Sequence, residues 1–207
     1  MPVWPATIEG TVSLSAPLKR DKPVAYNRGI YRASAKGSAP RLPSATDVVV
    51  YLEDPPAAVK LHLGEAAAGR AVMQQKGDRF VPHVLPIMAG TEVDFPNKDN
   101  YYHNVFSIVA GDRFDLGRFG GGEQASVRFD DEAIVVVRCE LHSRMKAYIV
   151  VLDHPHFTVP DSAGAYRLEK IPPGTYTVKA WHPTFGERRS VITIPSQSSI
   201  VNLPLNF

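Results

Sequence analysis

The chain has 207 residues, of which 44% are hydrophobic and 21% charged, and these proportions exclude wholesale disorder. Its 23 Lys and Arg residues against 21 Asp and Glu leave a formal net charge of +2 without a long basic run, so nucleic-acid binding has little electrostatic support. The 18 prolines and 15 glycines favour many short strands over long helices. The single cysteine, Cys139, excludes a disulfide within the chain and a four-cysteine zinc site.

Neither a membrane span nor a signal peptide is visible in the sequence. The longest aliphatic run, residues 133–137, is far shorter than the roughly 20 residues that cross a bilayer. Residues 1–5 have no basic segment followed by an apolar one. A cytosolic protein and an exported protein whose signal has been removed are both compatible with this pattern.

The N-terminal part predicts two strands separated by a long surface loop. Residues 7–14 alternate apolar and polar side chains, and residues 47–52 form a continuous apolar run that is typical of a buried strand. The loop between them, residues 17–46, is rich in Pro, Ser, Ala, Lys and Arg. Residues 57–69 are ambiguous, with one helical turn possible at residues 66–68.

The middle of the chain predicts an antiparallel sandwich or barrel. Turn signals such as Lys76-Gly77-Asp78 and Gly120-Gly121-Gly122 separate seven short strands there. These strands are expected at residues 71–74, 83–88, 91–95, 103–108, 124–129, 133–139 and 147–152. The triple glycine lacks the helix and the Lys-Ser/Thr pair of a phosphate-binding loop, so we interpret it as a surface loop.

The C-terminal tail predicts further strands, at residues 157–159, 165–168, 175–181, 190–194 and 200–203, which are too few to close a sandwich alone. Its Gly-x-Tyr-x-Leu segment at residues 164–168 and its Pro-Pro-Gly-x-Tyr segment at residues 172–176 resemble the carboxypeptidase-regulatory-like (transthyretin-like) family. The resemblance implies one discontinuous sandwich of residues 1–62 plus 154–207, with residues 70–153 inserted as a second β domain. Two independent neighbouring domains are the alternative.

Four side chains in the middle segment are of the types that bind copper in electron-transfer sites: Cys139, His142, Met145 and, 36 residues before the cysteine, His103. Cys139 ends a predicted strand, and the turn after it brings His142 and Met145 toward the same point. Taken singly, a cysteine on a valine-rich strand is more often a core residue. A Cys139–His142 nucleophile pair is a further option, but it leaves His103 and Met145 unexplained.

The Cys-x2-His-x2-Met spacing, together with residues 90–99 ahead of His103-Asn104-Val105, resembles the cupredoxin family with a short ligand loop of the amicyanin type. This resemblance covers about residues 70–153 and implies one type 1 copper ion. Its ligands would be the imidazoles of His103 and His142, the thiolate of Cys139 and the weak axial sulfur of Met145. Asn104 would join the two ligand loops near the sulfur. The fold expected for the whole chain is all-β: a cupredoxin Greek-key sandwich inserted into or next to a second, Ig/transthyretin-like β-sandwich.

The same resemblance implies a protein of the periplasm or the cell exterior that carries single electrons between redox partners. Because no coordination position is left open, no substrate turnover is expected and the chain is not expected to be an enzyme. Arg144 and Lys146 flank Met145, which suggests a partner with an acidic docking patch. One alternative is copper storage, delivery or resistance. Another is an interaction module in which the outer sandwich binds a partner and the copper is vestigial or structural.

Three other histidines, His154, His156 and His182, form either a second metal site or parts of a hinge and a turn. The latter is the expected outcome, and His83 is expected to be structural.

Overall fold

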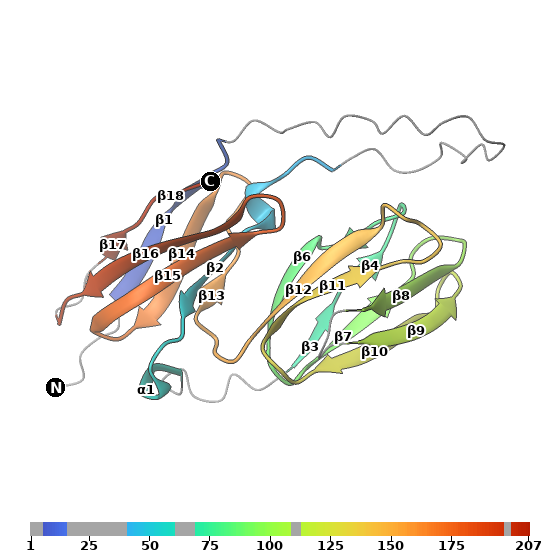
Figure 1. The fold of residues 1–207 in the computed structure, drawn as a ribbon, viewed down its shortest axis with the longest axis horizontal. Coiled ribbons are helices and arrows are strands. Elements are labelled where there is room, and N and C mark those ends of the chain that lie inside the picture. Colours follow the sequence, from blue (N-terminus) through green and yellow to red (C-terminus); the bar gives the residue numbers. More distant parts are fainter. Residues whose placement is uncertain (1–5, 16–40, 61–68, 109–112, 197–199) are drawn as a thin grey trace.

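The computed structural model describes residues 6–15, 41–60, 69–108, 113–196 and 200–207 (Figure 1). Strands dominate these residues, and their only helical elements are the 3-10 turn η1 (Ala45–Asp47) and the helix α1 (Ala57–Lys60). The fold is therefore all-β, as predicted. The helical turn considered at residues 66–68 and most of the loop at residues 17–46 lie outside the described residues. In the described part, no helix has the length and apolarity needed to span a membrane.

Strands from both ends of the chain share two four-stranded sheets, in the left half of Figure 1. In the first sheet, the N-terminal strand β1 pairs antiparallel with β14 and parallel with the two C-terminal strands β17 and β18. This sheet contains β1 (Ala6–Ser13), β14 (Ala165–Ile171), β17 (Ile200–Asn202) and β18 (Leu205–Asn206). The second sheet is antiparallel and has the order β13 (Phe157–Thr158), β2 (Val49–Glu53), β15 (Gly174–His182) and β16 (Gly186–Ile194).

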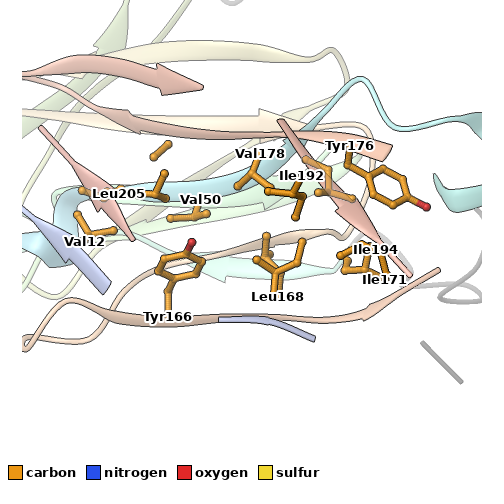
Figure 2. Packing of buried hydrophobic residues seen from close by; sticks show 14 of the residues in the cluster. Val12, Val50, Tyr166, Leu168, Ile171, Tyr176, Val178, Ile192, Ile194 and Leu205 are labelled. Atoms are coloured by element: carbon orange, nitrogen blue, oxygen red, sulfur yellow. The ribbon is translucent and has the colours of Figure 1, made fainter. Parts of the chain in front are cut away.

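These two sheets enclose one apolar core. In Figure 2, Tyr166, Leu168 and Ile171 of the first sheet point toward Val50 and Val178 of the second. Alternation along β14 explains the direction of Tyr166 and Leu168, because every second side chain of a strand points to the same side of its sheet. Ile171 is out of phase with these two, and it reaches the same side because the pairing of β1 with β14 shifts its register between Leu168 and Ile171, where Lys170 has φ +60°. The two sheets therefore pack face to face, with strands from residues 6–53 and 157–206 in both.

Gly10 shows how closely the terminal segments approach one another. A Cβ atom at this position would lie 2.1 Å from the carbonyl oxygen of Leu203, so any larger residue would push the C-terminal segment away from β1. The Leu203 N–H donates to the carbonyl of Glu9 across the same contact. The glycine at position 10 is thus explained by the close approach of the C-terminal segment to β1.

The strands of residues 70–152 form a second pair of sheets, in the right half of Figure 1. The three-stranded sheet has the order β10 (Gln124–Phe129), β7 (Thr91–Pro96), β3 (Arg70–Val72). The five-stranded sheet has the order β6 (Val84–Met88), β12 (Lys146–Leu152), β11 (Ala133–Arg138), β8 (His103–Ser107), β9 (Phe114–Phe119). A short hairpin, β4 (Gln74–Gln75) with β5 (Phe80–Val81), lies beside them. The pairs β6–β12 and β3–β7 are parallel, so the sandwich is mixed rather than purely antiparallel.

Strand β12 is buried on both faces. Its inward side chains, Ala147, Ile149 and Val151, belong to the core between the two sheets of residues 70–152. Its outward side chains, Tyr148, Val150 and Leu152, form a separate cluster with residues of β2 and, at its margin, of β15. A strand buried on both faces needs an uninterrupted apolar sequence, which explains the run in residues 147–152.

Two differences from the predicted strands have local causes. Residues 71–74 do not form one strand, since β3 ends at Val72 and β4 starts at Gln74. Strand β9 was not predicted, because Gly117 interrupts its apolar pattern. Gly117 has φ +71°, and the pairing of β8 with β9 shifts its register between Asn104 and Phe106, as at a β-bulge. The expected division into domains of residues 1–62 plus 154–207 and of residues 70–153 stays a prediction.

Candidate metal centre

Three donor atoms from two segments of the chain, β8 and the turn between β11 and β12, converge at one end of the five-stranded sheet. His103 is the first residue of β8, Cys139 directly follows β11, and His142 lies in the turn before β12. The two imidazole Nδ1 atoms are 3.1 Å apart, and the Cys139 Sγ atom lies 3.9 Å from His103 Nδ1 and 3.6 Å from His142 Nδ1. Three of the four expected ligands are therefore neighbours.

The turn between β11 and β12 also contains Met145, the remaining residue expected as a ligand. The Met145 N–H donates to the carbonyl of His142 at 2.8 Å, and the Cys139 N–H donates to the carbonyl of Met145 at 3.2 Å. These two bonds close the turn, and the Met145 side chain, 1% exposed, packs in the same buried cluster as Cys139.

Burial separates the four residues into an inner and an outer group. His103, Cys139 and Met145 are buried, whereas the side chain of His142 keeps 30% of its surface exposed. Of these four side chains, that of His142 is therefore the one in contact with solvent.

Asn104 connects the two segments that carry the donors. Its backbone N–H donates to the Cys139 Sγ atom at 3.5 Å, and its side-chain oxygen accepts from the Glu140 N–H at 3.4 Å. Its side-chain nitrogen donates to Asp115 Oδ1 at 2.6 Å and to the Gly117 carbonyl at 3.1 Å. The bulge in β9 thus supplies the acceptors that hold Asn104, and Asn104 holds the backbone after the cysteine.

A carboxylate that the sequence analysis did not identify lies behind the buried histidine. Asp99 Oδ2 is 2.8 Å from His103 Nε2, so the ring proton belongs on Nε2 and the lone pair of Nδ1 faces Cys139. Partial burial acts to raise the pKa of Asp99, but N–H donation from Gly77, the imidazole of His103 and N–H donation from Asp78 together hold that pKa below its usual value. Asp99 therefore stays ionised, which favours this ring orientation.

A tyrosine covers both imidazoles. The Tyr101 ring centroid is 5.1 Å from that of His103 and 5.8 Å from that of His142. Its hydroxyl donates to Asp78 Oδ1 at 2.7 Å, and this hydrogen bond is the main reason that the pKa of Tyr101 is raised. Asp78, in the turn between β4 and β5, also lies 3.7 Å from His142 Nε2. Asp78 and Tyr101 were likewise absent from the sequence-based set of site residues.

The loop that carries Asp99 and Tyr101 is held by Asn97, which is completely buried. The Asn97 side-chain nitrogen donates to the carbonyls of Tyr101 at 2.8 Å and Phe119 at 3.1 Å, and its oxygen accepts from the Asp99 N–H at 3.0 Å. A buried amide with these partners fixes the loop against β9. In the sequence, the one indication that Asp99 contacts His103 is its position four residues before that histidine.

The residues present fit a single metal ion. A point equidistant from the three donor atoms lies about 2.1 Å from each, which is the length of a bond from a metal ion to imidazole nitrogen or thiolate sulfur. Two imidazoles and a thiolate suit copper and zinc, whereas magnesium and calcium prefer oxygen. The donor chemistry is therefore compatible with the copper ion expected from the sequence.

The other candidate histidines, His154, His156 and His182, contact backbone groups outside the candidate metal centre. His154 Nε2 contacts the carbonyl of Leu52 at 2.9 Å, and His156 Nε2 contacts the carbonyl of Val59 at 2.9 Å. His182 Nδ1 accepts backbone N–H groups in the turn that follows β15. Among the described residues, these three imidazoles do not form a group of converging metal-ligating atoms.

No protein-family model matches the sequence, and no curated protein matches it significantly. Solved structures are similar to part of the chain. A copper-containing nitrite reductase from Thermus scotoductus SA-01 is 31% identical over 40% of this chain, with a TM-score of 0.39; the chain spans 22% of that protein's length. A purple cupredoxin from Nitrosopumilus maritimus is 21% identical over 41% of this chain and 99% of its own, with a TM-score of 0.36. A reduced amicyanin variant is 20% identical over 51% of this chain and 100% of its own, with a TM-score of 0.38.

One expectation is corrected by these similarities. The closed donor set led us to expect no substrate turnover, but the first of the three similar structures is an enzyme, a nitrite reductase. The expectation that the chain is not an enzyme is therefore contradicted. The expected likeness to cupredoxins is found over part of the chain, and the likeness of the tail to the carboxypeptidase-regulatory-like family stays a prediction.

Proposed function

We propose that this chain is a type 1 copper protein that carries single electrons between redox partners. The observation that supports it best is the convergence of His103 Nδ1, from β8, with His142 Nδ1 and Cys139 Sγ, from the turn between β11 and β12. Met145 would complete the set as the weak axial ligand. A copper ion held there would supply one-electron redox chemistry between its Cu(I) and Cu(II) states.

The chain's own contribution is rigidity. Strand β8 pairs with β9 and β11, β11 pairs with β12, and the ligand turn is closed by two backbone hydrogen bonds. Donor atoms held at the end of paired strands and in a hydrogen-bonded turn move little when charge changes at the centre, and a small rearrangement favours fast electron exchange. The buried side chains of Cys139 and Met145 also exclude water from the sulfur donors.

The surface around His142 suits a protein partner with an acidic docking patch. Leu141, the residue before His142, is 40% exposed, and Tyr102, the residue before His103, is 63% exposed, so apolar side chains that precede both histidines in the chain are accessible to a partner. Arg144 is exposed and Lys146 half-buried in the same ligand turn and the strand after it. Apolar contact next to the donor edge with positive charge at the rim favours fast, reversible docking.

The proposed organisation follows the chain. Residues 70–153 would form the copper domain, and residues 1–62 plus 154–207 the discontinuous second sandwich. We place the protein in the periplasm or outside the cell on the likeness of the ligand motif to cupredoxins.

Loading with Cu(II) tests the proposal directly. The protein is expected to turn intensely blue or green through thiolate-to-copper charge transfer, and Cys139→Ser is expected to abolish the colour while leaving the far-UV circular dichroism unchanged. A colourless wild-type protein that binds one equivalent of zinc or Cu(I) would contradict electron transfer and favour copper handling.

A comparison of two rates separates these functions further. An electron carrier is expected to exchange electrons much faster than it loses copper to a chelator. Fast loss of copper combined with slow electron exchange would favour storage or delivery instead.

A further inference from the structure

Each imidazole of the metal centre has a carboxylate on the side opposite the sulfur. His103 Nε2 is 2.8 Å from Asp99 Oδ2, and His142 Nε2 is 3.7 Å from Asp78 Oδ1. Both Nδ1 atoms meanwhile face Cys139. The exposed histidine is therefore not simply open to solvent, because an acidic side chain stands beside its outer nitrogen.

The position of Asp78 is set by three contacts. The Tyr101 hydroxyl donates to Asp78 Oδ1 at 2.7 Å, and the Asp78 N–H donates to Asp99 Oδ2 at 3.4 Å. The Gly77 N–H donates to Asp99 Oδ1 at 2.7 Å. The turn between β4 and β5 is thus attached to the same carboxylate that orients His103, so the two carboxylates and the two imidazoles form one connected group.

From this arrangement we infer that Asp78, held by Tyr101, is a positioning residue for His142. Its carboxylate favours the form of the imidazole that carries its proton on Nε2 and presents the Nδ1 lone pair to the metal. This inference rests on the metal-site proposal and deepens it. Carboxylates that orient metal-binding histidines in this way commonly raise metal affinity.

The charge of Asp78 has a second consequence. A negative charge a few ångströms from the imidazole stabilises the more highly charged state of a metal bound on the ring's other nitrogen. For copper, Asp78 therefore favours Cu(II) over Cu(I), and its removal raises the reduction potential.

Asp78→Asn is the sharpest test, because it removes the charge and preserves the geometry. Asn has the same size, tolerates the positive φ of residue 78 (+57°) and keeps an oxygen that accepts from Tyr101. Asp130→Asn is the matched control, since it removes the same charge in the turn before β11, at the opposite end of that strand from Cys139. Tyr101→Phe is a second variant, which keeps the ring and removes only the hydrogen bond to Asp78.

The first readout is the affinity for Zn²⁺, measured by competition with a chromophoric chelator. This measurement does not depend on redox activity. Asp78→Asn is expected to weaken zinc binding about 10-fold, Tyr101→Phe to weaken it less, and Asp130→Asn to leave it unchanged. The second readout is the reduction potential of the copper-loaded protein. It is expected to rise in Asp78→Asn and to stay unchanged in Asp130→Asn.

The inference would be overturned if Asp78→Asn had the same zinc affinity and the same reduction potential as Asp130→Asn. A wild-type protein without the thiolate-to-copper band would contradict the proposed function only, because the zinc series still decides the role of Asp78. If Asp78→Asn proves unstable, an unchanged zinc affinity in Tyr101→Phe counts against the inference and a loss supports it.

Discussion

The ring of Tyr148 lies edge-on to the ring of Trp181, with centroids 5.4 Å apart and planes at 68°. Tyr148 belongs to β12, the strand that follows the ligand turn, and Trp181 belongs to β15 of the other pair of sheets. Around them, Val49, Val84 and Val150 complete a buried cluster. The two pairs of sheets are therefore joined by a packed apolar contact rather than by the connecting segments alone.

Removing this aromatic contact is expected to destabilise the protein. Trp181→Ala should lower the free energy of unfolding by about 2–3 kcal/mol, since the ring is partly buried and contributes an edge-on aromatic pair. Urea titration followed by circular dichroism measures the loss. Val191→Ala, at a side chain 72% exposed, is the control and should change stability by less than about 0.5 kcal/mol.

The stability of the protein should fall between pH 6.5 and pH 5 because of His182. The side chain is 1% exposed, and burial lowers its pKa to about 4; the charge of Asp47 opposes this, and His83 and Arg41 add to it. In the unfolded chain, His182 binds a proton at the ordinary pKa of histidine, near 6.5. The contribution of neutral His182 to the free energy of unfolding is therefore fully present above about pH 6.5 and is lost as the pH falls toward 4. The expected loss from this residue at pH 5 is about 1–2 kcal/mol.

His182→Asn isolates that contribution. The asparagine oxygen can still accept the Thr184 and Phe185 N–H groups that His182 Nδ1 accepts at 3.0 and 3.2 Å. The variant should be less stable at pH 7.5, because the ring packs against Phe185, but its stability should depend less on pH than that of the wild type. An identical pH slope in urea titrations of both proteins would rule out His182 as the source.

Asn104→Ala should affect stability and the metal centre together. It removes the acceptor of the Glu140 N–H and the donor to Asp115 and Gly117, at a residue 1% exposed, so a loss of about 1–3 kcal/mol is expected. The backbone N–H to Cys139 Sγ remains but becomes less constrained. A shifted charge-transfer band in the copper-loaded variant checks this, and a band identical to that of the wild type would argue against a role for Asn104 at the sulfur.

Charge reversal in the ligand turn tests the docking surface. Arg144→Glu combined with Lys146→Glu should slow association with an acidic redox partner at low salt, and the difference should shrink at high salt because exposed charges are screened. Stopped-flow kinetics over a range of ionic strength measures the effect. Unchanged rates at low salt would remove the acidic partner from the proposal, and Arg128→Glu, in strand β10, provides the control.

Local pattern was sufficient for most strands. The strand at residues 124–129 was predicted with the bounds that the structure shows, and the strand at residues 147–152 begins one residue earlier, at Lys146. The alternating pattern did not predict β9 or β18. Gly117 interrupts the alternation in β9, and β18 has only two residues, which is too short to show a pattern. Strands this short or irregular depend on partners distant in the chain, such as Ser13 for Asn206.

For the metal centre, the sequence by itself determined the donor types. Cys139, His142 and Met145 lie within one short turn, so their spacing alone limits how far apart they can be, and His103 was added through a motif. Only the tertiary structure decided what surrounds them. Asp78, Asp99 and Tyr101 come from the turn between β4 and β5 and from the loop before β8, which are brought together by long-range hydrogen bonds that no spacing reveals. Donor identity is a property of residue type, whereas the orientation and charge of a donor's surroundings arise from contacts between distant segments.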